Sequence, residues 1–424
     1  MWIRAAELIG SRALWWACGL AGALAHLILW DISEPDELFS DFYKAYFPAA
    51  ELLLDEGPEA PWAFEGAEKI GFINFPIVAY LFAPLAALDW DAGWAYLGLG
   101  AAATIAAFML LRRLGGLEAA GGALLLFLFL VNGPLANSLR EGNTTHFILL
   151  LLIVALLLWR NGWEFAAGLV LGACAILKLP FLLFGIFFLL RGRWRIVAGG
   201  ATTVAATALL SLAVFGAGVH GEWIKCCVEP FMGKALPAFN VQSIDGLLMR
   251  FATGVAELEV WEPHDPSLLH KAARLSIVAA LLGGALWLMW RADRSRPARD
   301  ARAKGPLHEL EFVLVLVLAL VISPVSWSHY YLLLLLPWAL YLGGRLPLPE
   351  DALTRRLMWS GFLLASLPVV LVPLESDWLG AVAARTAVSA WLIGGLLILA
   401  ALMRGAWHAA TPRGRGAGMA EARI

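Results

Sequence analysis

One acidic residue in this sequence has the type and setting that proton transfer requires. Asp41 lies at the start of an aromatic stripe, and the stripe repeats at helical spacing through Phe39, Tyr43, Tyr46 and Ala50. A carboxylate at the edge of such a face can take the proton of a substrate hydroxyl as a general base. The alternative is an ordinary solvated charge, because the same stretch is rich in acidic residues. These are Asp36, Glu37, Glu51, Asp55 and Glu56.

Basic side chains near the ends of apolar runs form a second group of candidates. A cation at such a position calls for an anionic partner, and a substrate phosphate would be one. A helix that opens with hydrogen-bond donors, as Ser326-Trp327-Ser328-His329 does, also favours an anion. The candidate cations are Lys44, Arg140, Lys178, Arg250 and His329.

Structural alternatives exist for these basic residues. Lys178 could extend its ammonium along its own methylenes to the membrane interface. His329 could be a buried, hydrogen-bonded histidine among the neighbouring aromatic residues. Arg140 could form a surface ion pair with Glu141, which would contribute little energy. External tryptophans, Trp327 among them, more often anchor a protein at the membrane interface than stack on a ligand.

The elements that carry these residues are expected to be membrane helices. Hydrophobic residues make up 61% of the 424 residues and charged residues 15%, against roughly 25% charged in soluble domains. The charges are bunched between apolar runs near the roughly 20 residues that cross a bilayer as a helix. The sequence therefore predicts an all-α polytopic membrane protein with about 12 transmembrane helices. The expected helices cover residues 13–31, 92–111, 118–133, 146–159, 164–179, 180–190, 196–215, 271–290, 309–323, 329–344, 357–374 and 379–403.

Basic residues predict the orientation, because short cytoplasmic loops are enriched in Lys and Arg. With the N-terminus inside, every basic cluster falls on the cytoplasmic side and each pair of clusters brackets an even number of crossings. The clusters are Arg112-Arg113, Arg160, Arg191 to Arg195, Arg291 to Lys304, Arg345 to Arg356 and Arg404 to Arg415. Both chain ends are thus expected in the cytoplasm, and Asp41 on the outer side.

The expected organisation is one integral membrane domain over residues 1–424. The aromatic stripe suits a helix lying in the membrane interface, and the stretch around Pro76 and Pro84 suits a second surface-lying piece. The expected subdivisions are a first external loop with interfacial helices at 32–91, a large external loop at 216–270, a basic cytoplasmic loop at 291–308 and a cytoplasmic tail at 405–424.

Short motifs in a fixed order give the chain a family resemblance. They are Ser40 to Ala50, Asn74-Phe75-Pro76, Glu141-Gly142-Asn143, Lys178-Leu179-Pro180, Arg191 to Arg195, Asn240 to Ser243 with Arg250, and Ser323 to Tyr331. In this order they resemble glycosyltransferase family 87, integral membrane mannosyltransferases of the GT-C fold that take sugar from a polyprenyl-phosphate carrier. Asn143 departs from the Gln that is common in that family, and one residue is inserted between Asn240 and Gln242.

The resemblance implies a glycosyltransferase that moves a sugar, usually mannose, from a polyprenyl-phosphate donor to a glycolipid or glycan acceptor on the non-cytoplasmic face of a bacterial inner membrane. Asp41 is the expected base of an inverting displacement. The expected donor-phosphate ligands are His329, Lys178, Arg140 and Lys44. The expected substrate contacts are Tyr43, Asn143, Gln242, Ser243, Arg250, Trp327 and Tyr330.

Other functions receive less support from the sequence. A transporter or flippase for a lipid-linked saccharide would carry charges deep inside its helices, and the expected spans have few. No paired-Asp or Gly-x-Ser motif of an intramembrane protease lies within them. No D-x-D motif of nucleotide-sugar enzymes occurs in a cytoplasmic loop, so neither a metal nor a cofactor is expected. Membrane lipids are expected partners and nucleic acid is not, since no basic face accumulates.

Overall fold

The computed structural model describes residues 2–29, 38–62, 71–88, 91–295, 305–368 and 378–411. Within these ranges the chain is helical and no β-strand is present, although two isolated bridges, Ala235 with His264 and Val241 with Trp327, join loops. The expected all-α class is therefore confirmed. Parts of the expected loops and tail lie outside the described residues, namely 32–37, 63–70, 89–90, 296–304 and 412–424.

Long apolar helices make this a multi-pass membrane protein. Among the described residues, 4 helices are long and apolar enough to cross a membrane: Ala92–Gly115, Trp194–Phe231, Leu268–Arg294 and Gly380–Ala410. A fifth arises if α6 (Ala119–Leu130) and α7 (Gly133–Arg140), which meet at 52°, count as one broken span. Shorter apolar helices cover Arg12–Ile28, Thr145–Arg160, Glu164–Leu177, Leu179–Leu190 and Ser328–Leu342.

Helix boundaries follow local signals in the sequence. The helix α5 (Ala92–Gly115) closes on Gly116 in the left-handed conformation that a glycine C-cap adopts without strain. The Lys178-Leu179-Pro180 break separates α9 (Glu164–Leu177) from α10 (Leu182–Leu190), as expected. In α11 (Trp194–Trp223), Gly216 is non-helical (φ 74°), so a kink stands where the sequence predicted the helix to end.

Two expectations were wrong. The expected helix 357–374 is α16 (Ala352–Ala365), which begins earlier because Asp351 accepts a hydrogen bond from the Thr354 N–H as an N-cap. The helix α7 lies where no helix was expected. The expected helix 379–403 corresponds to the span Gly380–Ala410, in which a 3-10 turn at Ala387–Ser389 joins α17 (Trp378–Thr386) to α18 (Ala390–Ala410). Residues 30–31 and 369–374 of the expected helices lie outside the described residues.

The remaining elements complete the bundle. The other α-helices are α1 (Trp2–Leu29), α2 (Phe47–Asp55), α4 (Ala83–Ala86), α8 (Thr145–Arg160), α12 (Ile244–Ala252), α13 (Leu268–Arg294), α14 (Pro306–Ile322) and α15 (Leu335–Leu342). Two π-helical turns cover Phe42–Tyr46 and Ile224–Val228. The 3-10 turns cover Ala60–Trp62, Pro76–Leu81, Leu179–Phe181, Glu229–Phe231, Val255–Glu259, Ser328–Leu334 and Ala387–Ser389.

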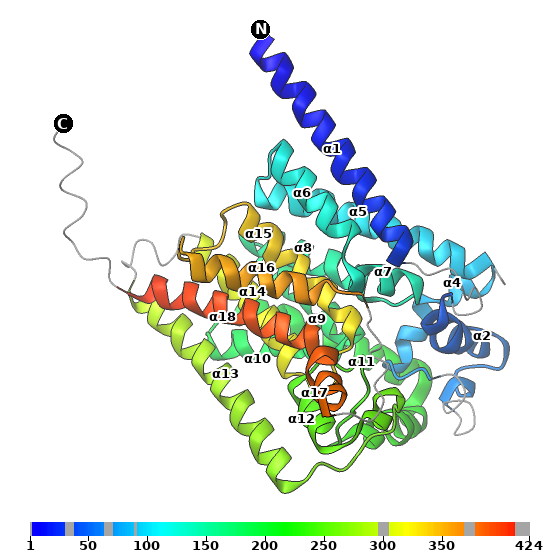
Figure 1. Ribbon diagram of the computed structural model, residues 1–424. Helices are drawn as coiled ribbons and strands as arrows, with labels where there is room; N and C mark the ends of the chain where they lie inside the picture. The colour runs from blue at the N-terminus through cyan, green and yellow to red at the C-terminus, as the bar shows by residue number, and fades with distance from the viewer. Residues whose placement is uncertain are drawn as a thin grey trace.

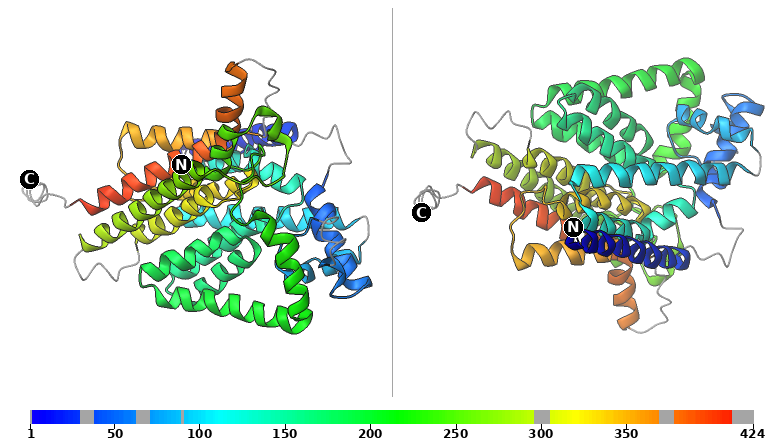
Figure 2. Two further views of the ribbon diagram at one scale, coloured as in Figure 1. Left: turned by 90° about the horizontal axis from the view of Figure 1, so that it is seen from below. Right: turned by 90° about the horizontal axis from the view of Figure 1, so that it is seen from above.

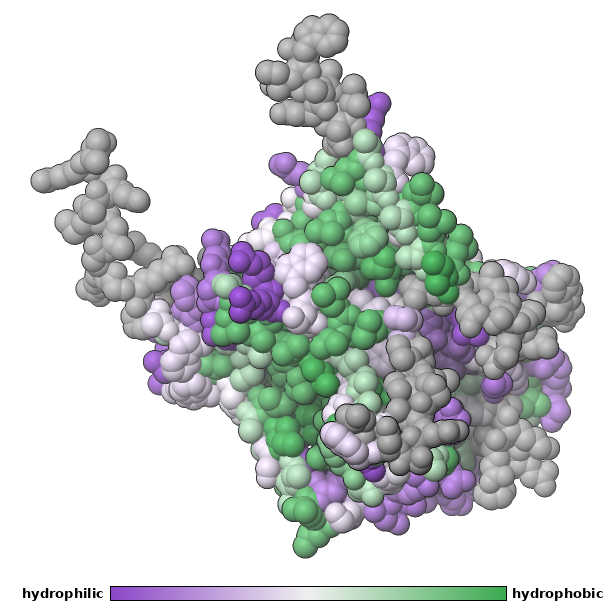
Figure 3. Space-filling view, viewed as in Figure 1, coloured by the Kyte–Doolittle hydropathy of each residue, from purple (hydrophilic) through white to green (hydrophobic). Residues whose placement is uncertain are grey.

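The helix α14 forms the centre of the bundle. From Phe312 to Ile322 it is apolar on all sides, and it is buried along nearly its whole length, as a core helix must be. The helices α9 to α11 lie on one side of it, and α1 and α16 lie on the other (Figure 2). In Figure 1 the start of α1 lies at the top and the end of α18 at the left, while α2 and α4 lie at the right and α12 and α17 in the lower part. Apolar residues cover a broad band of the visible face between hydrophilic patches (Figure 3).

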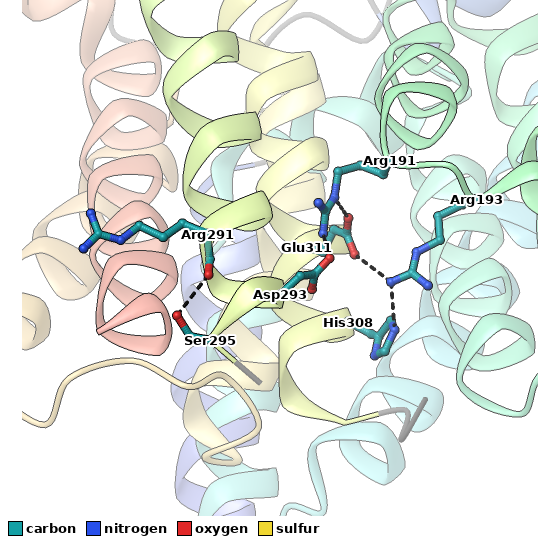
Figure 4. A network of polar contacts seen from close by, with 7 residues as sticks. All are labelled: Arg191, Arg193, Arg291, Asp293, Ser295, His308 and Glu311. Carbon is teal, nitrogen blue, oxygen red and sulfur yellow. Dashed lines mark hydrogen bonds and ion pairs between the residues drawn. The ribbon is translucent and has the colours of Figure 1, made fainter. Parts of the chain in front are cut away.

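A network of ion pairs ties helices together at the end that the arginine pattern predicts to be cytoplasmic (Figure 4). Arg191 Nε lies 2.6 Å from Glu311 Oε1, and its Nη2 lies 2.5 Å from Asp293 Oδ2. Arg193 Nη2 lies 3.7 Å from Glu311 Oε2 and 3.1 Å from His308 Nε2. These ion pairs join the α10–α11 turn to α13 and α14 and hold the three elements together at this end of the bundle.

Candidate active site

A hydrogen-bonded chain from a carboxylate to an ammonium forms the centre of the site. Asn143 Nδ2 donates to Asp41 Oδ2 at 2.7 Å, and Asn143 Oδ1 accepts from Lys178 Nζ at 3.3 Å. Thr145 donates to the same Oδ1 through its backbone N–H (3.1 Å) and its hydroxyl (2.7 Å). These donors fix the orientation of the amide, with its oxygen toward Lys178 and its nitrogen toward Asp41. One side chain therefore joins two charged residues that are distant in the sequence.

Close backbone packing brings Asp41 and Asn143 together. The Phe39 N–H donates to Arg140 O at 2.7 Å, and the Phe42 N–H donates to Glu141 O at 3.2 Å. Gly142 has φ 68°, and a Cβ there would lie 2.7 Å from Phe42 Cβ. Phe39 is the one non-glycine residue with positive φ (62°) in the described part of the chain. Such strain costs of order 1–3 kcal/mol and persists only where the surroundings impose it, often at functional sites.

An aromatic wall lies behind Asp41. The rings of Phe42 and Tyr96 stack at 4.8 Å, and those of Tyr46 and Phe82 stack at 4.6 Å. Asp41 itself is half-buried against this wall, so its setting differs from that of an ordinary solvated charge.

The surroundings of Asp41 shift its proton affinity. Burial raises the pKa of Asp41 above its ordinary value, while the hydrogen bond from Asn143 and the charges of Lys178 and Lys44 act in the opposite direction. The net shift is upward, which makes the carboxylate a stronger base.

Three basic side chains gather beside this chain of contacts. Lys178 is buried and its Nζ lies 4.7 Å from the centre of the Tyr330 ring, so its ammonium is not extended to the interface. His329 packs at 5.1 Å on the same ring, and His329 Nε2 is buried without a hydrogen-bond partner among the described residues. His146 is also buried; its Nδ1 bonds Ser138 Oγ at 3.1 Å. Lys178 interacts electrostatically with both imidazoles.

Paired loops hold the segment that carries His329. Val241 and Trp327 form an antiparallel bridge, flanked by hydrogen bonds from Gln242 N to Ser326 O (2.5 Å) and from Ser328 N to Asn240 O (2.8 Å). The 240–242 loop therefore fixes the position of the residues that begin the 3-10 turn containing His329 and Tyr330.

Gln242, Ser243 and Arg250 use their polar atoms within the protein. Gln242 Nε2 donates to Phe239 O and Val388 O at 2.6 Å each. Ser243 Oγ donates to Pro324 O at 2.8 Å and caps α12. Arg250 is 1% exposed and donates to Ala238 O, Val241 O and Ser389 Oγ at 2.8–3.0 Å. Burial lowers the pKa of Arg250 to about 10. All three were predicted to contact substrate. In the structure their hydrogen bonds stabilise the loop that pairs with the segment carrying His329.

The other expected site residues lie around the centre. The side chain of Lys44, three residues after Asp41 in the same turn, is exposed. The Tyr43 hydroxyl accepts the Gly93 N–H at 3.0 Å, and the Arg140 carbonyl holds the Phe39 turn. Trp327 is half-buried against the apolar cluster of the 236–241 loop. The structure thus brings Asp41, Asn143, Lys178, His329 and Tyr330 together.

Sequence reasoning missed Thr145 and His146. They lie two and three residues after Asn143, and this closeness to the Glu141-Gly142-Asn143 motif was the one available signal. Within the part of the chain that the structure describes, no group of three or more His, Cys, Asp or Glu side chains could hold a metal ion.

The fold and the site define an integral membrane protein with a polar, aromatic-lined centre at one end of a helical bundle. Residues 72–324 match glycosyltransferase family 87, and the chain belongs to this family as a membrane glycosyltransferase. The match contains Asn143 and Lys178, whereas Asp41 precedes its start and His329 follows its end.

A relative with a printed activity adds detail. The chain is 28% identical over 203 residues to a polyprenol-phosphate-mannose-dependent alpha-(1-2)-phosphatidylinositol mannoside mannosyltransferase from Mycolicibacterium smegmatis. The aligned part is 48% of this chain and 42% of that protein, so the chain spans less than half the length of this relative. No solved structure matches the chain.

Proposed function

We propose that the protein transfers a sugar, mannose by analogy with the relative, from a polyprenyl-phosphate donor to a hydroxyl of a lipid-linked or glycan acceptor. The observation that carries this proposal is the chain Asp41–Asn143–Lys178 beside the unpartnered imidazole nitrogen of His329. It supplies a base for the acceptor and cationic or donor groups for the leaving phosphate, which are the needs of such a transfer.

The reaction is a single displacement. The Asp41 carboxylate takes the proton of the acceptor hydroxyl while that oxygen attacks the anomeric carbon. The bond from the anomeric carbon to the phosphate oxygen breaks, and its electron pair stays on the polyprenyl phosphate. Lys178 and His329 stabilise the charge that grows there, since preorganised donors act most strongly in a water-poor site. Attack from the opposite face inverts the carbon, so a β-linked donor gives an α-linked product.

The proposal includes the membrane arrangement. The chain forms one GT-C-type domain with about 12 crossings and both ends in the cytoplasm of a bacterial cell. The stretches 32–91 and 216–270 lie outside, the loop 291–308 and the tail 405–424 lie inside, and the interfacial helices of the first loop hold Asp41 where lipid donor and acceptor meet. Supporting this, the start of α1 and the end of α18 lie away from α2, which follows the Asp41 turn (Figure 1).

The direct test is sugar transfer by the purified protein in lipid nanodiscs. Synthetic polyprenyl-phosphate mannose and an extract of lipid acceptors are incubated with it, and mass spectrometry detects an acceptor heavier by one hexose. Polyprenyl phosphate must appear in equal amount. Movement of the mannolipid across a sealed vesicle membrane, with no hexose transferred, would instead favour a flippase.

A further inference from the structure

A charged cavity lies at the opposite end of the bundle from Asp41. It has a volume of about 210 Å³ and is partly open. Its wall is formed by Trp159 and Arg160 at the end of α8, His308 and Glu309 in the first turn of α14, and Arg345 after α15. His308 also contacts Arg193 at 3.1 Å, so the cavity adjoins the ion-pair network of Figure 4.

Two polar atoms in this wall lack partners. Glu309 is 5% exposed; its Oε1 pairs with Arg160 Nη1 at 3.3 Å, but Oε2 has no hydrogen-bond partner among the described residues. The same holds for Arg345 Nε, which is also buried. Buried polar atoms are nearly always paired, so each of these points to a ligand. The cavity therefore needs one group that accepts from a guanidinium and one that donates to a carboxylate.

The charges define the chemistry of that ligand. Arg160 and Arg345 suit a phosphodiester, because guanidinium groups bind phosphate oxygens through paired hydrogen bonds. Glu309 Oε2 suits an ammonium close to that phosphate. The cavity holds about seven water molecules at about 30 Å³ each, which is room for a phosphate joined to a short amine. Trp159 adds an indole of the kind that gathers at the level of lipid headgroups.

We propose that this cavity binds the phosphoethanolamine headgroup of a phospholipid. The phosphate lies between Arg160 and Arg345, and the ammonium donates to Glu309. Basic pockets between membrane helices bind lipid headgroups in the same way. The site is separate from Asp41 and does not depend on the sugar-transfer reaction.

The test is native mass spectrometry of the full chain in detergent, titrated with single lipids. Phosphatidylethanolamine should bind about tenfold more tightly than phosphatidylcholine, whose quaternary ammonium has no N–H to donate. Glu309→Gln should bring the two affinities to within about twofold, and Arg345→Gln should weaken both by about tenfold. Arg355→Gln, an exposed arginine at the same end, should change neither.

Each of several outcomes would overturn the proposal. The first is equal binding of phosphatidylethanolamine and phosphatidylcholine by the unmodified protein. The second is a preference for phosphatidylethanolamine that persists in a folded Glu309→Gln variant. If phosphatidylglycerol binds as tightly as phosphatidylethanolamine, the ammonium group does not contribute to binding and the assignment to ethanolamine is wrong. Soluble glycerophosphoethanolamine competing at the same concentration would show that the free headgroup, and no lipid, is the ligand.

Discussion

Replacing Asn143 by Ala should impair the site without dismantling the fold. The substitution removes the hydrogen bond to Asp41 (2.7 Å) and the link to Lys178 (3.3 Å). A hydrogen bond to a charged group contributes about 1.5–3 kcal/mol, so losing two should raise the barrier by at least about 3 kcal/mol. At about 1.4 kcal/mol per tenfold, turnover should fall by roughly 10²-fold or more. The readout is hexose transfer by the purified variant under single-turnover conditions.

The pH profile separates positioning from general damage. Asp41 must be ionised to act as base, and the Asn143 hydrogen bond lowers its pKa. Without that bond the pKa rises, so the acidic limb of the rate profile should move to higher pH in Asn143→Ala. Asn143→Gln keeps the amide and should retain more activity.

A buried asparagine elsewhere gives the matched control. Asn132 accepts from Leu135 N and donates to Ser366 Oγ, so Asn132→Ala also removes buried side-chain hydrogen bonds, two of them, without touching the site. It should lower thermal stability and leave the acidic limb in place. An unshifted limb and near-normal turnover in Asn143→Ala would refute the reasoning.

Three further predictions follow from the same geometry. Lys178→Gln and His329→Ala should each weaken binding of polyprenyl phosphate by about tenfold or more, measured by titration of the lipid; unchanged affinity in both would return them to structural roles. Gly142→Ala should cost about 1–3 kcal/mol of stability and a large part of turnover, because its φ is positive and the new Cβ clashes, so a stable, fully active variant would contradict the packing described. A cysteine at Glu222 should react with a membrane-impermeant maleimide in intact cells and one at Arg299 only after permeabilisation; the reverse pattern would invert the topology.

Periodicity and composition predicted the all-α membrane class because lipid imposes a strong constraint. A segment inside the bilayer must satisfy its backbone hydrogen bonds internally, so apolar length alone identifies α5 and α13. Where polar capping decides a boundary the pattern fails, as at Asp351, which begins α16 earlier than the apolar run predicts. The helix α7 was missed because its sequence mixes polar and apolar residues, yet Asn132 caps it through a hydrogen bond from Leu135 N.

The candidate site was predictable in its residue types but not in its contacts. Asp41 and Lys178 were singled out as charges beside apolar runs, yet nothing in their spacing indicates that Asn143 joins them. That contact depends on Gly142, whose missing side chain lets two loops touch. Arg250 was predicted to contact substrate, and its spacing gave no sign that it donates to backbone carbonyls, which a buried loop needs as hydrogen-bond partners.

In the proposed reaction, Asp41 is the base of a sugar transfer from a lipid phosphate. The most direct measurement compares single-turnover hexose transfer by the unmodified protein and Asp41→Asn, with Asp55→Asn, at the end of the neighbouring helix α2, as a matched control. Asn keeps the shape and loses the basicity, so Asp41→Asn should bind both lipids normally and transfer sugar about 10²- to 10⁴-fold more slowly, while Asp55→Asn transfers at the normal rate. Equal rates in all three proteins would contradict the account.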